Sequence, residues 1–145
     1  MVHAGAIRRD ARGGNRPSVS LDLTIPERVA RARADLRMGA VVALCGERGS
    51  ALVQAAEAVS AARLEDLRAL GPLDLAITRW RAETLAARAY DDDVARLAVP
   101  ERADCAWIRA VADPAQDLSY PMKGPFTARR GGDAVLHRAA IRLAK

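Results

Sequence analysis

Hydrophobic and polar residues alternate along the chain with two periods, and the first clear period is helical. Val29, Ala32 and Leu36 fall on one side of a helix drawn over residues 24–39, which favours packing of that side on a sheet. Thr24 and the glutamate three positions later have the spacing of a capping box, and a glycine stands where the helix can end. The pattern therefore predicts that order begins with this helix.

Short β-branched runs and further runs with helical spacing follow it. The predicted strands are residues 40–45, the first part of 50–59, 73–78 and 94–99. The predicted helices are residues 60–71, 79–90 and 133–145, with 106–113 as a short helix or strand and 116–126 as a structured loop. Trp80 is expected in core or half-buried packing. This alternation predicts an α/β fold: a single compact domain with a small mixed sheet flanked by helices.

The length and composition limit the domain organisation. The chain has 145 residues, 50% of them hydrophobic, which suits one domain with one core. Residues 1–20 contain Arg and Gly but no apolar run, so they are expected to be a disordered lead rather than a secretory signal. Residues 21–130 form the predicted α/β module. Residues 131–145 begin a helix without a stop signal, and its apolar stripe predicts a contact surface; the stripe is Leu136, Ala139, Ala140 and Leu143.

The net charge of +5 raises the question of nucleic-acid binding. Lys123 and Lys145 are the two lysines, so 21 of the 23 basic residues are arginines, and they alternate with acids along the predicted helices. Such alternation is typical of a solvated helix face. Aromatic residues make up 3% of the chain and do not interleave with the basic ones, as single-strand binders require. Nucleic acid is therefore not the expected partner.

Cysteine, histidine and hydropathy exclude other classes. Cys45 and Cys105 lie far apart without zinc or disulfide spacing, so they are interpreted as small buried apolar residues in a reducing cytoplasm. His3 and His137 are equally isolated. No run approaches the roughly twenty apolar residues of a membrane span. The sequence thus predicts a soluble cytoplasmic protein that binds no metal and does not enter a membrane.

One stretch is a candidate for chemistry, because it places two glycines, an acid, a base and a hydroxyl between apolar runs. It consists of Gly46, Glu47, Arg48, Gly49 and Ser50. It could be a phosphate cradle, the remnant of an active site, or an ordinary hairpin. A P-loop needs wider glycine spacing and a following lysine, and the dinucleotide fingerprint is also absent from the sequence.

Two sets of carboxylates offer further candidates. Glu47 and Glu57 could form an acid pair across the turn, although surface positions are the simpler interpretation. The run Asp91, Asp92 and Asp93 is typical of a solvated loop or an N-cap cluster. Metal binding by that run is disfavoured, because hard-cation loops alternate their ligands around a glycine. The residues alone therefore predict no catalytic constellation.

Four phrases in order carry a resemblance to a known family. They are PERVARARADLRMGAVVAL, LVQAAEAVS, LGPLDLAITRWRAETL and ADPAQDLSYPMKGPFTARRGGDAVLHRAAIRLAK. From Ile25 to Lys145 the chain resembles the N-terminal region of bacterial GTP cyclohydrolase II proteins, whose front part is a reduced 3,4-dihydroxy-2-butanone 4-phosphate synthase. The resemblance implies a reduced form of that synthase fold.

The resemblance also implies what became of the candidate stretch. Aligned through the Ala-Ala-Glu phrase that ends at Glu57, the three acidic positions of the synthase loop fall on Glu47, Gly49 and Ala51. Two of the three acids are therefore replaced, which makes residues 46–50 a vestigial loop with no catalytic or metal-binding residue. The Cys-Asp-Cys phrase of the cyclohydrolase zinc site does not occur in this sequence. Residues 131–145 would lead toward that zinc-bearing domain.

The expected function is that of a non-catalytic N-terminal module of a GTP cyclohydrolase II-type protein of riboflavin biosynthesis. Its role would be structural or in assembly, with the cyclohydrolase catalytic domain or a second copy meeting the C-terminal helix, and with zinc held only by the other domain. One alternative is residual synthase activity, with magnesium and ribulose 5-phosphate bound at Glu47. Another is a small basic nucleic-acid-associated protein that uses Arg9, Arg12, Arg16 and the helical arginines.

Overall fold

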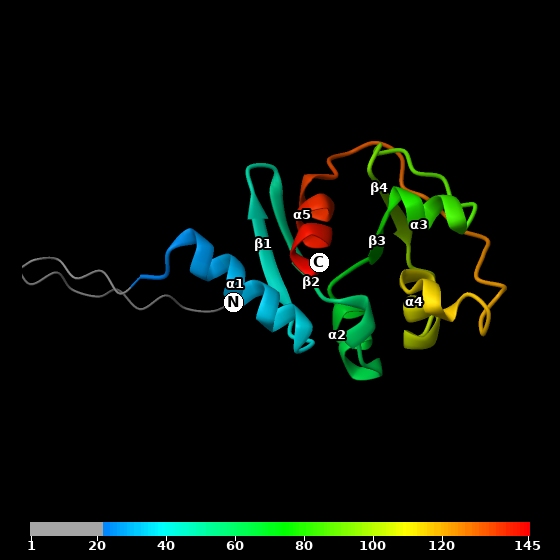
Figure 1. Ribbon diagram of the computed structural model, residues 1–145, viewed down its shortest axis with the longest axis horizontal. Helices are drawn as coiled ribbons and strands as arrows, with labels where there is room; N and C mark the ends of the chain where they lie inside the picture. Colours follow the sequence, from blue (N-terminus) through cyan, green and yellow to red (C-terminus); the bar gives the residue numbers. More distant parts are fainter. Residues whose placement is uncertain (1–21) are drawn as a thin grey trace, which may run out of the picture.

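Five α-helices and two antiparallel strand pairs make up residues 22–145, the part of the chain that the computed structural model describes (Figure 1). The helices are α1 (Ile25–Arg37), α2 (Ala61–Ala69), α3 (Arg79–Thr84), α4 (Cys105–Ala112) and α5 (Val135–Ala144). The strands are β1 (Val42–Gly46), β2 (Gly49–Val53), β3 (Asp74–Thr78) and β4 (Val94–Ala98). Two short 3₁₀ segments are η1 (Ala56–Ala58) and η2 (Pro114–Gln116). The lead predicted for residues 1–20 lies outside the described residues.

The four strands form two separate antiparallel sheets. β1 pairs with β2, and β3 pairs with β4 so that Asp74 faces Ala98 and Thr78 faces Val94. Within residues 22–145 no strand of one pair bonds to a strand of the other. The mixed α/β class is confirmed, but the prediction of one mixed sheet is wrong. Helix α5 contacts all four strands and lies between the two strand pairs in Figure 1, where a joined sheet would have to pass.

The core lies between the β3–β4 pair, α2 and α4. Its buried apolar side chains are Val59, Leu64, Leu75, Ile77, Ala82, Ala95, Leu97, Ile108 and Val111. Leu97 and Val111 have no exposed surface. The segment around Thr127 and Ala128 runs along the other edge of β4, with Ala98 donating its N–H to the Thr127 carbonyl. β4 is therefore enclosed on both edges, and Val94, Ala95, Arg96 and Leu97 are all buried.

Helix α1 begins and ends as its sequence predicts. The Thr24 backbone N–H and hydroxyl both donate to Glu27 Oε2 at 2.7 Å, and these bonds hold the pKa of Glu27 below its usual value. Gly39 follows the helix with φ +81°, a conformation that glycine adopts most easily. Of the predicted apolar side, Leu36 is buried, whereas Val29 stays exposed. The helix therefore packs mainly through its C-terminal half.

Helix α3 is shorter than predicted and is turned differently. It ends at Thr84 because Ala86 has φ +53° and the Ala87 N–H returns to the Ala82 carbonyl. Arg81 and Ala82 form its buried side. Trp80 is 82% exposed, so its predicted core packing is wrong. Neighbouring residues on a helix lie about 100° apart, and the inward position of Arg81 directs Trp80 outward.

Helix α5 is amphipathic and lies against α1 and both strand pairs. All of its residues from Leu136 to Ile141 are half-buried. The stripe that the sequence predicted as a contact surface is therefore already covered in part by the chain itself. Val135, at the N-terminal end of the helix, remains 56% exposed.

Candidate functional site

The candidate stretch is the tip of the first hairpin. Gly46 and Gly49 close the ladder as partners, and Glu47 and Arg48 form a two-residue turn beyond them. All four residues are exposed. Gly49 has φ +143°, which a residue with a side chain rarely adopts. Of the three possibilities that the sequence leaves open, the geometry of this stretch is that of a hairpin turn.

This hairpin tip is fitted against helix α5. A Cβ atom at Gly46 would lie 3.3 Å from Leu136 Cδ2, so the first glycine permits a close approach of the helix. Arg48 Nη1 lies 3.5 Å from Asp133 Oδ2, an exposed ion pair just before the helix. The turn therefore helps to position helix α5.

The acid pair considered for Glu47 and Glu57 is not brought together. Glu47 lies beyond one end of β2, and Glu57 lies in η1 beyond the other. β2 has five residues, so its two ends lie about 13 Å apart at the usual rise of about 3.3 Å per residue, and the two glutamates follow opposite ends. Within residues 22–145, no three His, Cys, Asp or Glu side chains form a group that could hold a metal ion.

The run of three aspartates forms a turn between α3 and β4, and arginines hold two of its members. Asp91 accepts from Arg96 Nε at 2.7 Å and from its Nη2 at 3.1 Å, and both side chains are largely buried. Asp93 accepts from Arg138 Nε of α5 at 2.6 Å, and that guanidinium lowers the pKa of the carboxyl. A strand follows the run, so the N-cap prediction is wrong. The solvated-loop prediction fails for Asp91, which pairs inside the fold.

A second charged network was not predicted from the sequence. Arg81 donates to both oxygens of Asp117, Nη1 at 2.6 Å and Nη2 at 2.7 Å, and Lys123 Nζ also bonds to that carboxylate. Arg81 and Lys123 are each 6% exposed. The two cations lower the pKa of Asp117 far below its usual value, Arg81 more than Lys123. The network holds the segment after α4 in place.

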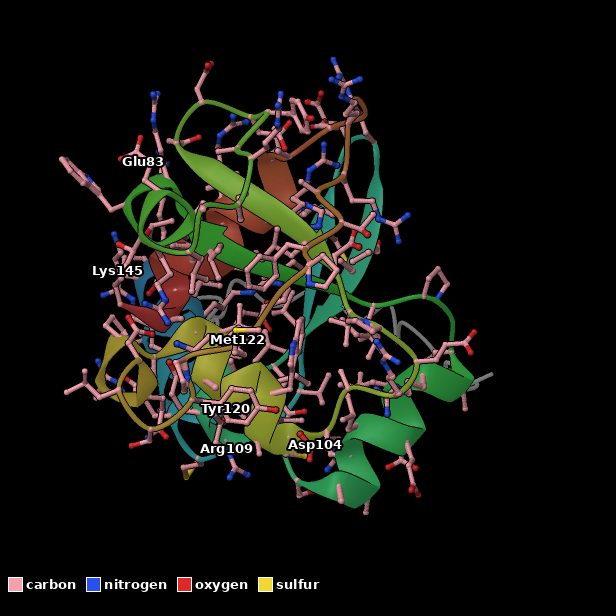
Figure 2. All side chains as sticks on the ribbon, turned by 90° about the vertical axis from the view of Figure 1, so that its right-hand side faces the viewer. Glu83, Asp104, Arg109, Tyr120, Met122 and Lys145 are labelled. Atoms are coloured by element: carbon pink, nitrogen blue, oxygen red, sulfur yellow. The ribbon has the colours of Figure 1, made fainter. Side chains whose placement is uncertain are left out.

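That segment crosses α4, as Figure 2 shows for the labelled Tyr120 and Met122. Trp107 of α4 donates its Nε1–H to the Lys123 carbonyl at 2.9 Å, and its ring packs at a tilt against Phe126. Residues 116–126 are thus a structured loop, as predicted. The signal that could have revealed the network is the single lysine among Pro and Gly residues, which has no use in a plain linker.

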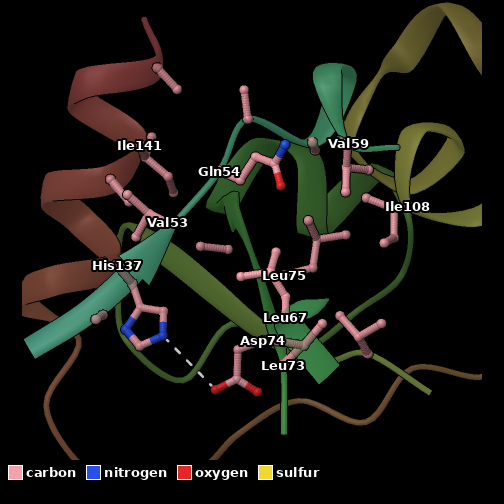
Figure 3. A pocket seen from close by; sticks show the side chains of 18 of the residues that line it. Val53, Gln54, Val59, Leu67, Leu73, Asp74, Leu75, Ile108, His137 and Ile141 are labelled. Carbon is pink, nitrogen blue, oxygen red and sulfur yellow. Dashed lines mark ion pairs between the residues drawn. The ribbon is translucent and has the colours of Figure 1, made fainter. Parts of the chain in front are cut away.

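A cavity of about 650 Å³ lies beside the first hairpin. Its walls come from β2, η1, α2, β3 and α5 (Figure 3). Apolar side chains dominate its lining, among them Val53, Leu67, Leu73, Leu75 and Ile141. Ser50, the last residue of the candidate stretch, borders the cavity, and so does Ala51. The cavity therefore begins at the end of residues 46–50.

Gln54 and His137 are the polar residues of this cavity that carry buried atoms without a partner. Gln54 Nε2 donates to the Gly39 carbonyl at 2.9 Å, but no group of residues 22–145 donates to its Oε1. His137 Nε2 lies 3.9 Å from Asp74 Oδ2, the dashed line in Figure 3, and its Nδ1 is buried and unpaired among the described residues. Burial lowers the pKa of His137, and the positive charge of Arg96 adds to that effect. The imidazole is therefore favoured in its neutral form.

The cysteines differ from their predicted environment. Cys45 is exposed, because alternate residues of β1 face away from the rest of the molecule, and Cys105 is half-buried at the start of α4.

Across residues 22–145 the helices are all too short or too polar to cross a membrane. Compared with protein-family models, with curated proteins and with solved structures, the chain matches none of them.

Proposed function

We propose that this chain is a non-catalytic module that supports the catalytic domain of a GTP cyclohydrolase II-type protein of riboflavin biosynthesis. The observation that carries the proposal is the hairpin tip at residues 46–49. The resemblance aligns this tip with the acidic loop of a butanone-phosphate synthase, and here it is a tight, exposed turn packed on α5.

Synthase chemistry would need several carboxylates around one metal-bound sugar phosphate. Of the three aligned positions, Glu47 points from an exposed turn, and Gly49 and Ala51 bring no carboxylate. Ala51 instead borders a cavity with mainly apolar walls. This surrounding favours a structural role over residual synthase activity.

Helix α5 is the element through which such a module would act. It contacts α1 and both strand pairs, so a partner bound to it would be rigidly connected to most of the fold. Its exposed Val135 provides an apolar contact point that the chain itself leaves uncovered. The partner would be the zinc-bearing cyclohydrolase domain, which supplies the metal chemistry.

The test is co-elution of the full chain with a separately expressed zinc-bearing cyclohydrolase domain, with GTP turnover measured in parallel. The expected result is a stable complex in which this chain alone turns over no GTP. Val135→Glu should weaken the complex, and Leu118→Glu, at a residue 96% exposed in the loop after α4, is the matched control. No co-elution, or GTP turnover by the chain alone, would overturn the proposal.

A further inference from the structure

The cavity beside the first hairpin has no part in the proposed function. Its volume of about 650 Å³ lies within the range of about 300–1,000 Å³ typical of small-molecule sites. Such sites combine apolar walls with a few polar groups that fix the orientation of the ligand. The walls here are built by leucine, isoleucine, valine and alanine side chains from strands and helices rather than from loops alone.

Gln54 supplies the polar group. Its Nε2 donates to the Gly39 carbonyl at 2.9 Å, so Oε1 is the atom of the amide that is left for another partner. Figure 3 shows the amide among the lining side chains, with its oxygen toward Leu75. Because no group of the described chain donates to Oε1, the fold contains a buried acceptor that is left unsatisfied. Buried acceptors of this kind are rare in folded proteins and need a partner.

The far end of the cavity is electrically balanced. Asp74 lines this end, but its Oδ1 accepts a hydrogen bond from Arg129 Nε at 2.8 Å. Its Oδ2 lies 3.9 Å from His137 Nε2. A charged ligand would therefore find no unpaired charge opposite it at this end. Of the other charged residues in the lining, Arg81 is bound to Asp117 and to carbonyls of α4, and Glu57 and Lys145 are exposed. The apolar walls and the acceptor therefore fit an uncharged molecule.

We propose that this cavity binds a small, neutral, largely apolar molecule that donates one N–H or O–H group to Gln54 Oε1. The apolar part fills the space among Leu67, Leu73, Leu75 and Ile141. The donor satisfies an acceptor that the chain itself leaves without a partner. A site of this class is independent of the proposed assembly role, because it requires no second protein.

Indole and indene are suitable probes, because the two fused-ring molecules have nearly the same shape and only indole carries an N–H. Each is titrated into the ¹⁵N-labelled full chain and followed by amide chemical shifts. Indole should bind about tenfold more tightly than indene, the ratio expected when a buried acceptor gains its donor. The shifted signals should be those of cavity residues such as Leu75 and Ile141.

Two variants distinguish binding at this site from nonspecific hydrophobic binding of the probes. Gln54→Leu removes the acceptor at similar volume and should make the two probes bind equally. Gln116→Leu, at an exposed glutamine, is the matched control and should keep the tenfold ratio. If Gln54→Leu fails to fold, Ala140→Leu, which fills the cavity from α5, should abolish binding of both probes.

Three results would overturn the inference. One is no binding of either probe up to its solubility, and another is equal binding of both by the unaltered chain. The third is a cavity whose signals shift with protein concentration while the chain dimerises, which would make a second copy the occupant.

Discussion

Replacing Arg81 by methionine should destabilise the fold strongly, although the substitution keeps an unbranched side chain of similar length. Arg81 Nη2 donates to the carbonyl of Ala110 at 2.9 Å, and its Nε donates to that of Val111 at 2.7 Å. Both residues are almost fully buried in the last turn of α4, where helix carbonyls have no intrahelical partner. Each carbonyl left unsatisfied costs about 1–3 kcal/mol, so the two together should lower the free energy of unfolding by about 2–6 kcal/mol.

The loss would be a large part of a domain stability of about 5–15 kcal/mol. Urea unfolding of the full chain, followed by circular dichroism, measures it directly. Arg79→Met is the matched control on the same helix, because Arg79 makes an exposed pair with Glu83 and its loss should change stability little. Arg81→Lys keeps the charge, but a lysine cannot reach both carbonyls and Asp117. It should therefore lower the free energy of unfolding almost as much as Arg81→Met does.

The outcome that refutes this reasoning is a value for Arg81→Met within about 1 kcal/mol of the control, which is less than the cost of one unsatisfied carbonyl. Full rescue by Arg81→Lys would refute it in part, since charge rather than hydrogen-bond geometry would then hold α4.

Leu97→Ala should lower the free energy of unfolding by about 2–5 kcal/mol, because Leu97 has no exposed surface, whereas Leu70→Ala at an exposed position should lie within about 0.5 kcal/mol of the parent; equal effects in urea unfolding would contradict the assigned core. The pH dependence should report on His137. Its pKa is lowered in the fold, so protonation favours the unfolded chain; its contribution to stability is complete above the ordinary pKa of 6.5 and is lost as pH falls below it. Thermal unfolding at pH 5.0–7.5 should show this slope, and His137→Gln should flatten it; the same slope in the variant would assign the effect elsewhere.

The local parts of the fold were predictable from the sequence, because their signals lie within a few residues. The capping box at Thr24 and the glycine after α1 fix both ends of that helix. The strands were also found close to their positions. Which strand pairs with which depends on contacts between distant segments. Here α5 separates the two strand pairs in a way that no local pattern indicates.

The charged networks and the cavity could not be predicted for the same reason. Arg81 and Trp80 are neighbours in the sequence, and only the position of α4 decides that the arginine turns inward and the tryptophan outward. Gln54 is an ordinary polar residue after a strand, and the burial of its unpaired oxygen depends on how distant segments pack around the cavity. The stretch 46–50 is the exception, since two glycines between apolar runs are a local signal of a turn.

The position of α5 sets a sequence of events for folding. Each pair joins strands that are near in the chain, β1 with β2 through a two-residue turn and β3 with β4 through α3 and the turn after it, so both pairs can form early. The contact of α5 with α1 spans a much longer interval, as the bond from Arg33 to the Arg142 carbonyl shows across 109 positions. During synthesis the β1–β2 hairpin and the α5-facing side of β3 and β4 therefore stay uncovered until α5 has left the ribosome, although β3 and β4 can already pack on α2 and α4. In that interval the nascent chain is most exposed to aggregation and most in need of a chaperone.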